Sequence, residues 1–253
     1  MPADPVPAAP TGRPIVFYSP HQDDETLFMG QVIARHALAN REVHVVLCSN
    51  GSTSGARALI NGDDDSYWWG GYHYPPREGY APLSAAEFAE ARTRELVAAC
   101  AQLGVPASRV HLGRADAPGT STMDLPDGIT TTWATQVMQS WASHFTALGW
   151  SSVGHYTMWW GDNHSDHAAL GSALQAWAPS DRRWLVKPEQ ASTAGAGVYG
   201  LPSTSAAMIL QMARRAGGCY RAWQPGAGCF ACGYHSVGFD GPEDGNPNYL
   251  VAP

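Results

Sequence analysis

The stretch FYSPHQDDETLFMG, Phe17–Gly30, decides how this sequence is interpreted. The apolar run Ile15–Tyr18 has the character of a buried strand, and it ends abruptly in a proline, a histidine, two aspartates and a glutamate. Carboxylates crowded together repel one another, so such a turn lies either in solvent or around a cation. A histidine beside two aspartates is also a ready set of ligands for a divalent metal ion.

Strand-like runs recur along the chain and alternate with stretches of helical length. This alternation predicts an α/β fold with a mostly parallel sheet and helices on both of its faces. Ligands of such sheets bind beyond the carboxyl ends of the strands, and the opening motif follows the first strand directly. No G-x-G-x-x-G pattern occurs there, so nothing supports a dinucleotide cofactor. The runs are Pro14–Ser19, Val43–Cys48, Arg109–Leu112 and Ser152–Met158.

The helical stretches carry start and stop signals. Apolar residues from Leu27 to Leu38 fit a helix packed on the sheet, which Asn40 would end. Ser84 and Glu87 form a capping box at the start of another helix, which runs to Gly104, and a third covers Trp133–Leu148. With no internal repeat or low-complexity linker, we predict a single domain over residues 14–253, preceded by an irregular, proline-rich arm over residues 1–13.

Composition excludes several classes of function. The chain has 253 residues, a formal charge of -7 and only 15 lysines and arginines, with no basic run to form a nucleic-acid groove. No apolar stretch reaches the roughly 18 residues of a membrane span, so we expect no membrane partner. The first residues lack the features of a signal peptide, which makes the cytoplasm the expected location. The sequence carries no signal for the oligomeric state.

The five cysteines offer two interpretations. Two lie in apolar contexts, and three form a C-x9-C-x2-C pattern ahead of His235. An odd number without an export signal favours buried thiols over a disulfide framework. A second zinc site and a single local disulfide are the alternatives, although zinc ligands usually come in two close pairs. The cysteines are Cys48, Cys100, Cys219, Cys229 and Cys232.

The second metal-binding signal follows a later strand. His21 and Asp24 are three residues apart on one tight loop, and the segment GDNHSDH, Gly161–His167, follows the run Ser152–Met158. Two histidines and one carboxylate leave Zn²⁺ an open position for water, whose pKa the ion lowers to about 7. The second segment offers His164, Asp166 and His167.

The remaining polar residues suggest hydrolysis. Asp23, adjacent to Asp24, is free to act as general base on the water, and a second histidine is available for the developing oxyanion or the leaving amine. This division of roles suits the cleavage of an unactivated carbonyl bond. Taken alone, each half is an ordinary surface turn or helix cap. Both stand at the ends of predicted strands, which favours the metal site.

At this point the chain resembles a known family. The segments PHQDDE (Pro20–Glu25), EARTREL (Glu90–Leu96) and HSDH (His164–His167) are similar to three motifs of the PIG-L/LmbE-like zinc-dependent N-acetylglucosaminyl deacetylases. The resemblance runs from about Ile15 to Gly171. It implies a Rossmann-like fold and an N-deacetylase, an amidohydrolase that acts on an N-acetylglucosaminyl substrate.

The resemblance also implies roles for individual residues. Arg92 matches the substrate-contacting arginine of the family, although a local ion pair with Glu95 is an equal alternative. Asp166 would hold a histidine in place, and His164 would assist the oxyanion or the leaving group. The base would be Asp23, and the zinc ligands would be His21, Asp24 and His167.

The chain departs from the family pattern in an aromatic insert, residues 61–83. Loops of this length commonly act as lids, and the aromatic side chains suit a sugar ring or an aromatic aglycone. The alternative is a surface loop that folds its own aromatic residues into a small satellite core. We assign substrate contacts to Trp68, Trp69 and Tyr72 in the insert. A smaller departure is Gln22, where the family more often has proline.

The substrate follows from these features only in outline. We expect a small-molecule glycoconjugate, with a natural product such as a glycopeptide-antibiotic pseudoaglycone ahead of a small GlcNAc glycoside of thiol biosynthesis. The glycine- and cysteine-rich part from about Lys187 onward matches the family poorly and is expected to complete the rim of the pocket. A non-catalytic metal- or sugar-binding module is the alternative of another class, and the presence of both Asp23 and His164 speaks against it.

Overall fold

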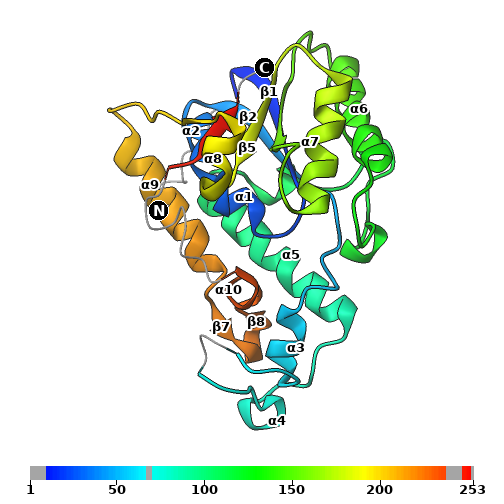
Figure 1. Cartoon of the computed structure of the whole chain (residues 1–253), viewed down its shortest axis with the longest axis vertical. Coiled ribbons are helices and arrows are strands. Elements are labelled where there is room, and N and C mark those ends of the chain that lie inside the picture. Colours follow the sequence, from blue (N-terminus) through cyan, green and yellow to red (C-terminus); the bar gives the residue numbers. More distant parts are fainter. Residues whose placement is uncertain (1–9, 67–69, 238–246, 252–253) are drawn as a thin grey trace, which may run out of the picture.

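A seven-stranded sheet forms the centre of the molecule. The computed structural model describes residues 10–66, 70–237 and 247–251. The strand order is β3-β2-β1-β4-β5-β9-β6, in which β1 to β5 are parallel neighbours and β9 is antiparallel to both β5 and β6 (Figure 1). The sheet strands are β1 (Gly12–Ser19), β2 (Arg41–Leu47), β3 (Val110–Leu112), β4 (Gly154–Met158), β5 (Arg182–Val186), β6 (Gly197–Val198) and β9 (Tyr249–Val251).

Alternate residues of β1 serve the two faces of the sheet. Ile15 and Phe17 pack in one apolar core with α2, α5 and α9, and Val16 and Tyr18 pack in another with α6 and α7. Because successive side chains of a strand point to opposite faces, this strand has to be apolar throughout. The helices of the layers are α1 (Asp24–Leu27), α2 (Gly30–Leu38), α5 (Ala85–Gln102), α6 (Thr131–Ala147), α7 (Ser165–Trp177), α8 (Ala191–Ala194) and α9 (Ala206–Cys219).

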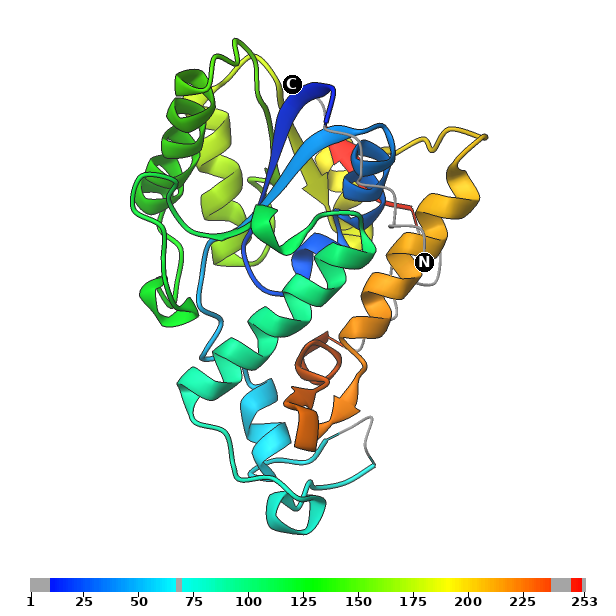
Figure 2. The ribbon, with the colours of Figure 1, turned by 180° about the vertical axis from the view of Figure 1, so that it is seen from behind.

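These layers confirm the predicted fold of a single α/β domain with a mostly parallel sheet. Figure 2 shows α5 and α9 running side by side over one face of the sheet. The capping box of Ser84 and Glu87 is present at the start of α5. The expected helix after the opening motif is divided into α1 and α2, with Phe28 and Met29 between them, and Asn40 follows its end with a φ of 55°.

A third, smaller core supports the aromatic insert. The insert connects α3 (Ala56–Asn61) to α5, contains α4 (Pro75–Glu78) and packs on the hairpin of β7 (Trp223–Gln224) and β8 (Cys229–Phe230). This part of the insert forms the satellite core that was the alternative to a lid, because Tyr80 packs on Trp223 and Phe230. Trp68 and Trp69 lie outside the described residues.

The C-terminal part contributes two features that the sequence did not indicate. Helix α10 (Cys232–Val237) packs on α3 and α5, and β9 extends the sheet beyond β5. The five cysteines are free thiols, and the described residues hold no metal-binding cluster that includes a cysteine. Among the helices of the described ranges, none has the length and apolar character needed to cross a bilayer.

Candidate functional site

The reversal in strand order creates the site. Strand β1 lies between β2 and β4. The chain leaves β1 toward β2 and leaves β4 toward β5, in opposite directions, which opens a crevice at the carboxyl ends of β1 and β4. A cavity of about 750 Å³ lies there, lined by the loop after β1, the start of α7, and C-terminal residues 187–189 and 236–237. Ligand pockets commonly have volumes of this order.

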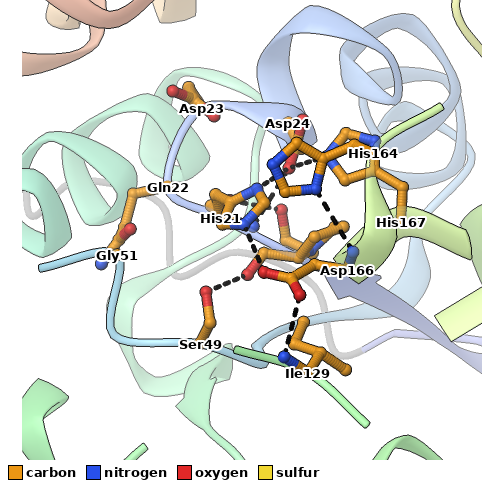
Figure 3. Close-up of polar contacts among 12 residues, drawn as sticks. His21, Gln22, Asp23, Asp24, Ser49, Gly51, Ile129, His164, Asp166 and His167 are labelled. Carbon is orange, nitrogen blue, oxygen red and sulfur yellow. Dashed lines mark hydrogen bonds and ion pairs between the residues drawn. The ribbon is translucent and has the colours of Figure 1, made fainter. Parts of the chain in front are cut away.

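Asp24 is shared by two imidazoles on the floor of the cavity. Its Oδ2 atom lies 3.1 Å from Nδ1 of His21 and 3.2 Å from Nε2 of His167. His21 lies in the loop after β1, Asp24 is the first residue of α1, and His167 lies near the start of α7 (Figure 3). Burial alone would raise the pKa of Asp24, but the two histidines beside it outweigh burial and hold the pKa well below its usual range.

Each of these histidines is oriented by a second carboxylate. Nε2 of His21 lies 3.0 Å from Asp166 Oδ2, and Nδ1 of His167 lies 3.2 Å from Asp162 Oδ2. Asp166 is held in turn by the amide N–H of Ile129, which donates to its Oδ1 atom at 2.9 Å. Both rings therefore have one nitrogen bound to an orienting carboxylate and the other directed at Asp24, an arrangement typical of metal-ligating histidines.

Asp162 is itself anchored by a lysine from the end of β5. The ammonium of Lys187 donates to Asp162 Oδ1 at 2.9 Å, and the amide N–H of His164 donates to the same oxygen at 2.8 Å. Burial alone would raise the pKa of Asp162, but these donors and His167 outweigh it and lower the pKa to about 2. Asp162 is therefore an anion that fixes the orientation of His167.

His164 has a different hydrogen-bonding pattern from the other two histidines. Its Nδ1 atom accepts from the amide N–H of Asp166 at 3.3 Å, which leaves the hydrogen of the neutral ring on Nε2. Its ring lies 4.7 Å from those of both His21 and His167. Burial, followed by the charges of these two histidines, lowers the pKa of His164. His164 is thus suited to donating a hydrogen bond into the cavity.

Asp23 occupies a strained backbone position beside this cluster. Its φ of 145° lies in a region that non-glycine residues rarely adopt, and such strain collects at functional sites. Its amide N–H donates to Glu25 at 3.1 Å, and its carboxylate pairs with Arg92 at 2.9 Å. Tyr220, at the end of α9, donates to the same glutamate at 2.8 Å. Burial raises the pKa of Asp23 to about 6, although Arg92 opposes the rise.

Gly51 allows the loop after β2 to approach this site. Its φ is 64°, and a Cβ atom at this position would clash with the side chains of Gln22 and Arg92. Arg92 donates to the carbonyl oxygens of Gly51 at 3.1 Å and of Gln22 at 3.0 Å. The side-chain amide of Gln22 donates to the carbonyl oxygen of Asn50 at 2.9 Å. Gln22, which differs from the family pattern, therefore connects the loop after β1 to the loop after β2.

The model of one protein family, described as PIG-L, GlcNAc-PI de-N-acetylase, matches residues 16–178, more than half of the chain. The chain belongs to the PIG-L family. A comparison with curated proteins found no match to the chain.

Solved structures agree with the fold of the family. A deacetylase of teicoplanin biosynthesis, solved as a triple mutant, has a TM-score of 0.53 at 18% identity, over 94% of this chain and 96% of its own. The A40926 pseudoaglycone deacetylase Dbv21 has a TM-score of 0.50 at 18% identity, over 93% and 94%. The 4-carboxy-2-hydroxymuconate hydratase GalB of Pseudomonas putida KT2440 has a TM-score of 0.51 at 17% identity, over 96% and 97%. At these identities the likeness concerns the fold, which evidently hosts more than one reaction.

The structure brings most of the predicted site residues together in this PIG-L domain. Ligand atoms of His21, His164 and His167 lie within 4.8 Å of one another, and Asp24 lies between two of these rings. Arg92 lines the cavity and pairs with Asp23, while Glu95 accepts from the backbone of α10. The alternative of a local Arg92–Glu95 ion pair is therefore not what the structure shows.

Tyr72 is the predicted site residue that the structure places elsewhere. It is half exposed and does not line the cavity. Helix α4, which follows it closely in the chain, lies at the end of the molecule away from α1 (Figure 1). The neighbour of Tyr72, His73, points inward and stacks on Trp223, with ring centroids 4.4 Å apart. Because neighbouring side chains in extended backbone face opposite ways, burying His73 turns Tyr72 outward.

Sequence reasoning missed Asp162 and Lys187. Asp162 stands two residues before His164, within the segment already singled out, so its position was available from the sequence. Lys187 carried no such signal, because its role depends on the pairing of β4 with β5. The expectation that the region from Lys187 onward completes the rim agrees with residues 187–189 and 236–237 lining the cavity.

Proposed function

We propose that this protein is a zinc-dependent N-deacetylase that removes the acetyl group from an N-acetylglucosaminyl glycoconjugate. The observation that carries the proposal is the position of Asp24 between His21 and His167, with a carboxylate behind each ring. Two imidazoles and one carboxylate are a donor set that zinc prefers in catalytic sites. Membership of the PIG-L family supports the same reaction.

The proposed ligands are His21, Asp24 and His167. His164 is left out because its Nδ1 atom accepts a hydrogen bond from a backbone N–H, so that Nε2 of the neutral ring carries the hydrogen. When bound, Zn²⁺ would polarise the amide carbonyl and acidify a water molecule. Asp166 and Asp162 would keep the two ligating rings in their tautomers.

Asp23 and His164 would carry out the proton transfers. Asp23 lines the cavity next to the proposed ligands, and its carboxylate would accept a proton from the attacking water. The N–H of His164 would donate to the oxygen of the acetyl group as negative charge develops on it. The amide C–N bond then breaks, the leaving amine receives the proton held by Asp23, and acetate leaves. Arg92 would hold Asp23 in position through their ion pair.

The substrate is proposed from the cavity and the fold neighbours together. The cavity is large enough for an amino sugar with part of its aglycone. Of the neighbours of similar fold, one is a deacetylase of teicoplanin biosynthesis and another is the A40926 pseudoaglycone deacetylase Dbv21. A natural-product glycoconjugate, such as a pseudoaglycone, is therefore our first choice. A small GlcNAc glycoside of thiol biosynthesis is the second. A binding module without catalysis would have no need for both Asp23 and His164.

The test is a panel of N-acetylglucosaminides incubated with zinc-loaded protein. Mass spectrometry should detect loss of the acetyl group and release of acetate from at least one member. Asp23→Asn protein, loaded with the same amount of zinc, is the matched control and should be nearly inactive. If the panel, including a pseudoaglycone, stays intact with the zinc-loaded parent, the proposed reaction is wrong.

A further inference from the structure

The charged side chains that line the cavity affect which substrates can bind there. Apart from histidines, the cavity lining contains two cationic side chains, Arg92 and Lys187. Both are held by aspartates: Arg92 pairs with Asp23 at 2.9 Å, and Lys187 pairs with Asp162 at 2.9 Å. Arg92 also donates hydrogen bonds to the backbone carbonyls of Gly51 and Gln22. Neither side chain therefore presents an unpaired positive charge to the substrate.

The segments outside the described residues contribute no further lysine or arginine to the cavity. Residues 1–9, 67–69, 238–246 and 252–253 lie outside the description, and their sequences contain no lysine or arginine. Lys187 is the only lysine of the protein. The absence of an available cationic side chain therefore does not depend on where those segments lie.

The mouth of the cavity is acidic instead. Asp127 and Glu189 line it, both are exposed, and neither forms an ion pair within the described ranges. Asp127 accepts hydrogen bonds from Thr53 at 3.0 Å and Ser52 at 3.4 Å, which leave its charge in place. Glu189 belongs to the C-terminal part, beyond the residues that match the family model. The acidic side of the cavity therefore combines one residue of the matched range with one residue beyond it.

We propose that the cavity selects a glycoconjugate whose aglycone is uncharged or cationic and discriminates against one that carries a phosphate near the sugar. This inference rests on the proposed function and narrows its substrate class. A phosphate at the mouth would face two carboxylates with no unpaired lysine or arginine beside it. Each acidic charge at about 8 Å in water weakens binding of an anion roughly twofold, and more where water is excluded.

The test uses three glycosides that differ only in the charge of the aglycone: hydroxyethyl, aminoethyl and phosphoethyl. Dissociation constants are measured with the glucosamine forms and zinc-loaded protein, so that binding is read without turnover. Acetate release is measured with the N-acetyl forms. We expect the phosphoethyl compound to bind about five- to tenfold more weakly than the hydroxyethyl compound, and the difference to shrink at high salt.

Glu189→Lys should bind the phosphoethyl compound about fivefold more tightly than the parent protein does. The matched control is Asp63→Lys, which makes the same change in net charge at an exposed residue outside the cavity and should recover little. Equal dissociation constants for the three compounds, or equal effects of the two variants, would overturn the inference. If the constants rank as expected but no N-acetyl compound releases acetate, the proposed function fails while the inference about charge stands.

Discussion

Replacing Asp162 with asparagine isolates the contribution of an orienting carboxylate to metal binding. Asp162 Oδ2 lies 3.2 Å from Nδ1 of His167, and this contact directs Nε2 of the ring toward Asp24, the position from which it would bind a metal ion. An amide at this position offers one acceptor oxygen, and three donors now converge on Asp162: His167, Lys187 and the amide of His164. The substitution therefore leaves at least one donor without a partner and removes the charge that orients the ring.

The expected loss follows from this geometry. Removing an orienting partner of a metal-ligating histidine typically lowers metal affinity about 10- to 100-fold, or about 1.4–2.8 kcal/mol. Zinc affinity is measured by competition with a chelator of known affinity, and unfolding of the metal-free proteins by urea reports any change in the fold. Lys187→Met is the matched control, because it removes the ammonium but leaves the Asp162–His167 hydrogen bond, and it should lower the affinity less.

Two results would refute this reasoning. If Asp162→Asn binds zinc as tightly as the parent while His167→Ala does not, the carboxylate does not orient the ligand. If His167→Ala itself keeps the parental affinity, His167 is not a ligand, and the proposed set of ligands is wrong.

Three further predictions concern the base and the stability of the fold. Asp23→Asn should keep zinc but lower kcat by roughly 10²–10⁴-fold, the range for removal of a general base, and a parental rate would exclude this role. Burial lowers the pKa of His155 to about 4 from an ordinary value of 6.5, so the unfolded chain binds more protons than the folded protein between these pH values. The neutral His155 therefore contributes about 3 kcal/mol to the free energy of unfolding above pH 6.5, and this contribution is lost as the pH falls to about 4. Between pH 7 and pH 4, the free energy of unfolding in urea should fall by about 3 kcal/mol less in His155→Gln than in the parent. An equal loss in both proteins would contradict this assignment. Gly171→Ala should destabilise the protein by about 1–3 kcal/mol, because the added Cβ overlaps the backbone of Trp160, whereas Gly218→Ala, in a helix with open space around it, should be neutral or stabilising. Comparable thermal unfolding of these two variants would show that the packing around Gly171 is looser than described.

Local patterns in the sequence were sufficient to predict the elements that carry the chemistry. The apolar run Ile15–Tyr18 is buried on both sides, as its composition predicted, and the capping box of Ser84 and Glu87 starts α5. The two polar segments after β1 and β4 meet because these strands are parallel neighbours, so their carboxyl ends lie at one edge of the sheet. The sequence therefore indicated a shared site before any distance was known.

The parts that sequence reasoning missed depend on contacts between distant residues. Strand β9 joins the sheet by pairing with β5, and Tyr220 reaches Glu25 across 195 positions of the chain. The local sequence of Tyr249–Val251 is that of an ordinary surface segment. The local sequence around Tyr220 is that of an ordinary core tyrosine. Such roles arise from the packing of whole elements and have no local signature.

The aromatic insert also shows that local sequence does not determine where a segment packs. Its aromatic composition suggested a substrate lid, yet the described part faces a satellite core because His73 and Tyr80 find partners in the C-terminal hairpin. By itself the sequence determined the strands, the capped helix and the two polar segments, since each depends on neighbours within a few residues. Only the tertiary structure decided three other features: the packing of the insert on the C-terminal hairpin, the anchoring of Asp162 by Lys187, and the acidic charge of the cavity mouth. Each of them requires side chains that only the folded chain brings within a few ångströms.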